Sequence, residues 1–152
     1  MSELFEGSSP LARRLESEGP FASPAAMIAA ARRVKDLLTE SEKIATLDAH
    51  PRIGERSERL SAASLREQGT EVLAELDSLN ERYESRFGFR FVIHVNRRSK
   101  AAILEMLRLR VENDRDQELA TGLQAVVDIA QDRLAQDRLA QDRLAEGEVT
   151  GA

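Results

Sequence analysis

More than any other stretch, FGFRFVIHV at residues 87–95 limits the folds that this chain can adopt. Phe87, Phe89, Phe91, Ile93 and Val95 alternate there with other residues, which is the period of an extended chain. No other part of the sequence repeats this period, so the stretch has no second strand with which to form a sheet. We therefore expect one buried extended segment in a protein that is otherwise helical.

Elsewhere apolar residues recur every three or four positions, the spacing of helices that bury one face. Pro10 and the pair Ser23-Pro24 mark two helix starts, because serine caps a helix and proline fits its first turn. Gly88 ends a later helix, and Pro51 disfavours helical geometry at His50, the residue before it. The expected helices cover residues 11–15, 24–38, 41–50 with Ser41 as the cap, 64–87, 101–111 and 116–134.

The sequence therefore predicts an all-α fold: a single-domain helical bundle at residues 1–134 with a C-terminal extension at 135–152. A length of 152 residues fits one domain. The extension contains the unit QDRLA three times, between Gln131 and Ala145. Five residues advance a helix by about 500°, so Leu134, Leu139 and Leu144 point in three directions around the axis. We expect a solvated helix with a disordered end, and a partner-binding helix is the alternative.

The composition argues against several classes of protein. The net charge is −5 and the arginines are scattered among carboxylates, which is unlike a nucleic-acid-binding surface. No apolar run approaches the ~20 residues of a membrane span, and no secretory signal opens the chain. There is no cysteine, and the spacing of His50 and His94 is not a metal-ligand pattern. We expect a cytoplasmic protein without metal, membrane or nucleic-acid contacts.

Three stretches carry side chains suited to chemistry: HPRIG at 50–54, SLREQ at 64–68 and the extended segment. Each also has a structural interpretation. His50 can be a helix-ending histidine stabilised by the helix dipole. Ser64 and Glu67 fit a capping box, and the extended segment can simply be core. Taken one at a time, the structural interpretations are preferred.

Taken together, these stretches resemble a family. In order, LFEGSSPLARRL, PF, HPRIG, SLREQ, LNERYESRFGFRFVIHV, ILEMLRLRVEN and QELATGL are similar to the 2-oxo-4-hydroxy-4-carboxy-5-ureidoimidazoline (OHCU) decarboxylases of urate breakdown. The resemblance covers residues 4 to 134, and its HP, SxxEQ and NxxYxxRFGF motifs are specific in combination. It implies an all-helical homodimer that acts on a small anionic substrate, OHCU, and needs no metal or organic cofactor.

The resemblance also implies the site. His50 matches the catalytic acid of the HP pair, and Pro51 lines the site. Glu67 is expected to stabilise the protonated imidazole ring of His50 and to hold its orientation. The substrate-binding positions correspond to Ser64, Leu65, Arg66, Glu67 and Gln68, and to Phe91, Val92, Ile93, His94 and Val95.

The implied chemistry suits these residues. Loss of carbon dioxide leaves electrons beside a substrate carbonyl, which takes them up as an enolate, so the substrate is its own electron sink. One acid then protonates one face to give (S)-allantoin, and histidine suits that task near neutral pH. The alternatives are a catalytically inactive helical dimer that acts as a scaffold, and a helical interaction module. Intact His50, Glu67 and Gln68 favour the enzyme.

The chain departs from the family at Arg90, where many relatives have proline. An arginine there reaches either the substrate carboxylate or solvent, and we expect solvent. The chain also ends in EVTGA, without the peroxisomal Ser-Lys-Leu signal of animal relatives, which favours a bacterial, cytosolic enzyme.

Overall fold

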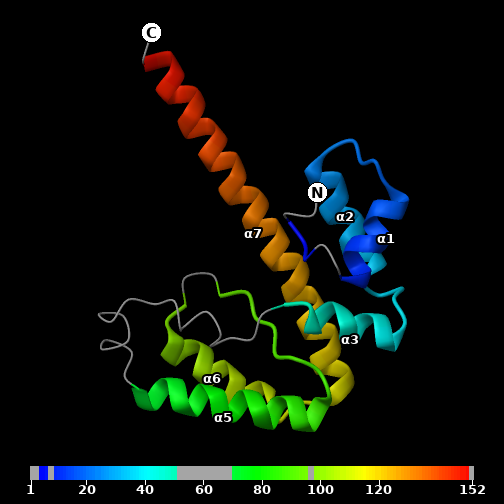
Figure 1. Cartoon of the computed structure of the whole chain (residues 1–152), viewed down its shortest axis with the longest axis vertical. Coiled ribbons are helices and arrows are strands. Elements are labelled where there is room, and N and C mark those ends of the chain that lie inside the picture. Colours follow the sequence, from blue (N-terminus) through cyan, green and yellow to red (C-terminus); the bar gives the residue numbers. More distant parts are fainter. Residues whose placement is uncertain (1–3, 7–8, 51–69, 96–97, 151–152) are drawn as a thin grey trace.

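The computed structural model describes residues 4–6, 9–50, 70–95 and 98–150. Within these ranges there are six helices and no strand: α1 (Pro10–Glu18), α2 (Pro24–Val34), α3 (Glu40–Asp48), α5 (Thr70–Phe87), α6 (Lys100–Arg110) and α7 (Arg115–Thr150). Figure 1 shows that the first half of α7 lies among the other helices, whereas its second half extends away from them. The predicted all-α fold class is confirmed.

Serine side chains begin three of the short helices. Ser9, Ser23 and Ser99 each accept a hydrogen bond from the backbone N–H three residues further on, at the starts of α1, α2 and α6. Pro10 and Pro24 follow two of these caps, in the first helical turn, where a missing N–H costs no hydrogen bond. The helix starts predicted at Pro10 and at Ser23-Pro24 are confirmed.

The predicted cap of α3 at Ser41 is wrong, because α3 begins two residues earlier with Thr39 as its cap. The Thr39 hydroxyl accepts from the Glu42 N–H, and the Glu42 carboxylate accepts from the Thr39 N–H. This reciprocal capping box satisfies two amides that the helix itself leaves without partners. Ser41 offers no such arrangement, because the residue three positions further on is Ile44.

Gly88 ends α5, as predicted, with a φ of 82° that glycine adopts without strain. The extended segment begins after this glycine, so Phe87 belongs to the helix and not to the segment. Its ring centroid lies 4.6 Å from that of Tyr83, one helical turn earlier. The segment is core on both sides of the chain, because Val92 and Ile93 are both buried. The expectation of a buried extended segment is therefore confirmed up to Ile93, whereas Val95 is 39% exposed.

The core forms where the first half of α7 meets the other helices. α1 packs on α2 and α3, α2 and α3 pack on α7, and α5 packs on α6. Gly122 allows α7 to approach α3 closely, since a Cβ at this position would lie 3.0 Å from Leu47 Cδ2. Leu47 is fully buried and lies three residues before His50. This contact holds the C-terminal end of α3 against α7.

α7 continues without interruption through the QDRLA repeats to Thr150. Leu134 packs against the core, whereas Leu139 is 49% exposed and Leu144 is 69% exposed. This loss of burial has two causes. The five-residue period turns successive leucines away from one face, and the second half of α7 extends beyond the other helices (Figure 1). The domain boundary at 134 stays a prediction, because no break in the helix marks it. No helix of the described chain is both long and apolar enough to cross a membrane.

Candidate active site

His50 lies in a bend just beyond the end of α3, and it is 5% exposed. Its backbone N–H donates to the carbonyl of Leu47 at 3.1 Å, and its own carbonyl accepts from Arg90 Nη1 at 2.9 Å. The helix therefore ends two residues before the expected bound at residue 50, and His50 lies just outside it, where the following proline disfavours helical geometry. Hydrogen bonds on both sides of the residue and burial of the ring hold His50 in one place.

A carboxylate and a guanidinium from opposite ends of the chain lie beside His50. Glu6 Oε1 is 4.0 Å from His50 Nδ1 and accepts a hydrogen bond from Arg133 Nη2 at 3.3 Å. Arg133 Nη1 also donates to the carbonyl of Leu4, so α7 anchors the N-terminal segment next to the ring. Sequence reasoning assigned no role to Glu6 or Arg133. Although both lie within the region of family resemblance, 127 residues separate them and no local pattern connects them.

The extended segment is held by side chains of α6 and α7. Arg110 Nη1 on α6 donates to the carbonyl of Val92 at 3.0 Å, and the same guanidinium lies over the Phe91 ring at 4.6 Å. On α7, Asp132 Oδ2 lies 3.8 Å from His94 Nε2, which makes an ion pair when that histidine is protonated. Phe91, Val92 and Ile93 are buried, His94 is partly buried and Val95 is exposed.

A buried charge pair supports the segment from the helical side. Glu118 on α7 is fully buried and accepts hydrogen bonds from Arg110 Nε at 2.8 Å, Tyr83 Oη at 2.7 Å and Asn113 Nδ2 at 2.8 Å. Burial, and then the hydrogen bond to the Glu118 carboxylate, raise the pKa of Tyr83 far above its usual value. The phenol therefore stays protonated and keeps donating. The network connects α5, α6 and α7 to the carbonyl of Val92.

The expectation that Arg90 points to solvent is wrong. Its backbone N–H donates to Asp48 Oδ1 at 3.0 Å, and its Nη1 donates to the carbonyls of Asp48 and His50. The physical reason is the end of α3, where helix carbonyls without partners and a carboxylate together attract a cation. Arg90 directly precedes Phe91, so these contacts bring the start of the extended segment beside the backbone of His50.

The remaining predicted site residues lie outside the described part of the chain, so their roles stay predictions. They are Pro51, Ser64, Leu65, Arg66, Glu67 and Gln68. Among the site residues that the structure describes, His50 and the segment 91–95 are brought together through the contacts of Arg90.

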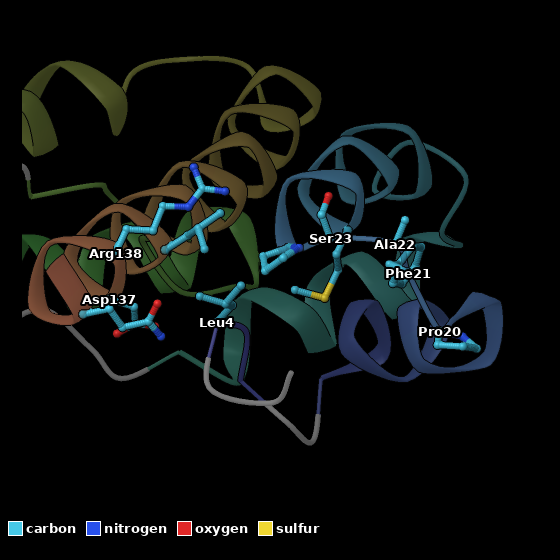
Figure 2. A pocket seen from close by; sticks show the side chains of 11 residues that line it. Leu4, Pro20, Phe21, Ala22, Ser23, Asp137 and Arg138 are labelled. Carbon is cyan, nitrogen blue, oxygen red and sulfur yellow. The ribbon is translucent and has the colours of Figure 1, made fainter. Parts of the chain in front are cut away.

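A cavity of about 560 Å³ lies elsewhere, between the loop before α2 and the second half of α7. Figure 2 shows Phe21 and Ser23 on one side of it, and Asp137 and Arg138 of the repeats on the other. Of the described site residues, neither His50 nor any of Phe91 to Val95 lines this cavity, so we do not take it as the candidate active site. Over the described ranges, no group of three or more histidine, cysteine, aspartate or glutamate residues is arranged to hold a metal.

Comparisons with known proteins agree with the residue pattern. A family model described as OHCU decarboxylase matches residues 1–135. The chain is 36% identical over 143 residues to the 2-oxo-4-hydroxy-4-carboxy-5-ureidoimidazoline decarboxylase of Haloferax volcanii, covering 87% of this chain and 83% of that protein. It is 30% identical over 142 residues to the protein of the same name from Halalkalicoccus jeotgali, covering 88% and 80%. A crystal structure of OHCU decarboxylase in the presence of (S)-allantoin superposes with a TM-score of 0.70 at 26% identity, covering 89% of this chain and 94% of that one.

Proposed function

The chain belongs to the OHCU decarboxylase family and is a carboxy-lyase of urate degradation, and we propose that it converts OHCU to (S)-allantoin with His50 as the acid. The family match over residues 1–135 carries this proposal, because it spans every residue to which a role is assigned. The burial of His50 and the hydrogen bonds to its backbone support its role, since an acid must hold one position relative to the substrate.

The reaction needs one bond broken and one proton delivered. The substrate carries its hydroxyl and carboxylate on carbon 4 of the ring and its ureido group on carbon 5. The bond between carbon 4 and the carboxylate breaks, carbon dioxide leaves, and the electron pair moves toward carbon 5 and the ring nitrogen that is double-bonded to it. His50 then donates a proton to carbon 5, the hydroxyl proton passes to that nitrogen as carbon 4 becomes a carbonyl, and the imidazole is left neutral. Because the neighbouring carbon–nitrogen double bond, and not a carbonyl, takes up the electrons, the substrate is still its own electron sink and the proposal requires no cofactor. A fixed acid protonates one face only, which gives the S product.

Glu6 and the extended segment have separate tasks in this proposal. The Glu6 carboxylate, 4.0 Å from His50 Nδ1, places a negative charge beside the protonated ring. Glu67 keeps the role implied by the resemblance, orienting the same ring. The backbone of residues 91–95 is outside any described helix, so its amides are available to bind the carbonyl and ureido groups of the substrate. The bond from Arg110 to the carbonyl of Val92 supports this role by fixing the segment.

The decisive experiment generates the unstable substrate in the cuvette from urate, with urate oxidase and hydroxyisourate hydrolase. Circular dichroism then follows optically active allantoin. We expect a rapid signal from the wild-type protein and a kcat roughly 10²- to 10⁴-fold lower for His50→Asn, the usual contribution of a general acid. His94→Asn is the matched comparison, because His94 is the other histidine of the chain. This variant changes KM more than kcat and keeps the product optically pure.

Two outcomes contradict the proposal in different ways. A His50→Asn protein with the wild-type kcat shows that another group is the acid. Slow racemic decay that the wild-type protein does not change shows that the family motifs persist without activity. In that case the scaffold alternative becomes the better explanation.

We also propose that the enzyme works as a homodimer in the cytoplasm, as the resemblance implies. Sedimentation equilibrium should give twice the chain mass of 16.9 kDa. A mass of one chain at micromolar concentration contradicts the dimer without affecting the assignment of the reaction.

A further inference from the structure

Arg90 joins the two parts of the candidate site through three hydrogen bonds. Its backbone N–H donates to Asp48 Oδ1 at 3.0 Å, and its Nη1 donates to the carbonyls of Asp48 at 3.0 Å and His50 at 2.9 Å. Its Nε lies 3.9 Å from Glu84 Oε1 on α5. The side chain of Arg90 therefore contacts both the C-terminal end of α3, next to His50, and α5. The backbone of Arg90 is itself part of the extended segment.

The chemistry of these contacts suits a clamp better than a substrate-binding arginine. The last carbonyls of α3 have no partner within the helix and carry the negative end of its dipole. A guanidinium is rigid and permanently charged, and its Nη1 carries two N–H groups, so this one nitrogen can donate both to the carbonyl of Asp48 at the helix end and to that of His50 just beyond it. Nη1 is already committed to the carbonyls of Asp48 and His50, and the Nε edge faces Glu84.

We propose that Arg90 is a positioning residue, which fixes His50 at a set distance from the substrate-binding backbone at 91–95. The inference rests on the proposed function, because it takes His50 as the acid and the segment as the substrate platform. Arg90 acts through His50 and does not touch the reacting atoms. Of the three hydrogen bonds that Arg90 makes, loss of the guanidinium leaves the one between the Arg90 N–H and Asp48, which does not reach His50.

The test compares Arg90→Met, which keeps an unbranched stem but removes the guanidinium, with Arg90→Lys, which keeps the charge and can still donate to a carbonyl. We expect Arg90→Met to lower kcat by roughly tenfold to a hundredfold, the effect of misplacing a reacting group by about 1 Å. KM changes by less than about threefold, because substrate binding is retained. The allantoin loses optical purity as water competes with the displaced acid, and Arg90→Lys recovers part of both kcat and optical purity.

Arg82→Met is the matched control, since Arg82 lies on α5 and is paired at the surface with Glu112, with side-chain exposures of 63% and 67%. Its kcat and product purity should equal those of the wild type. Thermal unfolding of each variant shows whether a loss of activity comes from a loss of folded protein. If Arg90→Met does not fold, Arg90→Gln decides by the same readouts, because glutamine is uncharged and too short to reach the carbonyl of His50. A kcat and an optical purity equal to those of the wild type in Arg90→Gln would overturn the inference.

A double-mutant cycle with His50→Asn separates this inference from the proposed function. If Arg90 acts through His50, Arg90→Met has no further effect on kcat once His50 is replaced. An equal loss in both backgrounds overturns the inference and leaves His50 as the acid. A raised KM with unchanged kcat also overturns it and makes Arg90 a substrate contact. A His50→Asn variant with wild-type activity overturns the proposed function itself.

Discussion

Replacing Glu118 by glutamine tests how much the buried charge pair stabilises the fold. The side chain of Glu118 is 0% exposed and that of Arg110 is 9% exposed, with Nε and Oε1 2.8 Å apart. Glutamine keeps the shape of glutamate and one oxygen that can accept from Tyr83 and Arg110. In the wild type, Asn113 Nδ2 donates to Glu118 Oε2. The substitution removes the negative charge and places an NH₂ group opposite this donor. The variant therefore leaves a buried cation uncompensated and two donors facing each other.

The expected cost follows from these two losses. Breaking a buried ion pair by changing one partner typically costs about 3–5 kcal/mol. Native domains are stable by only about 5–15 kcal/mol, so Glu118→Gln removes a large part of the free energy of unfolding. With a urea m-value of about 2 kcal/mol per molar, the midpoint of unfolding falls by roughly 2 M. Urea titration at pH 7, followed by circular dichroism of the helices, measures this shift.

The control is an ion pair of the same chemistry at the surface. Arg82→Ala breaks the exposed Arg82–Glu112 pair and should cost less than about 1 kcal/mol. A midpoint for Glu118→Gln as close to the wild type as that of Arg82→Ala would refute the reasoning. It would mean that desolvation of the pair cancels its attraction in the folded state.

Three further predictions follow from single residues. Tyr83 is the only tyrosine and the chain has no tryptophan, so absorbance of tyrosinate reports its ionisation alone. Its raised pKa means that the folded protein shows no ionisation near pH 10 whereas the urea-unfolded protein does. Because the folded state holds the phenol proton more tightly than the unfolded state, protonated Tyr83 stabilises the fold. This stabilisation is complete below about pH 10, the ordinary pKa of tyrosine, and is lost as the pH rises further. Tyr83→Phe removes this dependence of the free energy of unfolding on pH. Gly88→Ala, at a φ of 82°, should cost about 1–2 kcal/mol in urea unfolding, and no loss would contradict the left-handed conformation. Gly122→Ala, with its Cβ 3.0 Å from Leu47 Cδ2, should cost about 1–3 kcal/mol, and an unchanged midpoint would show that Leu47 has room to move.

Much of the local structure could be predicted from the sequence because its causes lie within a few residues. Ser23 caps α2 through the amide three residues on, and Gly88 ends α5 through its own backbone preference. The five-residue repeat predicts that Leu139 and Leu144 leave the buried face of the helix, and their exposure also reflects the extension of α7 beyond the other helices. Where two local signals competed, sequence reasoning failed. Ser41 and Thr39 are both capping residues, and the reciprocal partner at Glu42 favours Thr39.

The surroundings of His50 were decided by the tertiary structure. By itself the sequence determined that His50 stands at a helix end, that one extended segment follows α5, and that the motifs belong in one family. It did not determine that Glu6 and Arg133 lie beside that histidine, or that Arg90 binds its carbonyl. These contacts join residues from 40 to 127 positions apart, and they depend on how α3, α5 and α7 pack. A hydrogen bond between distant residues leaves no periodic trace in a sequence, since periodicity records only which face of a segment is buried.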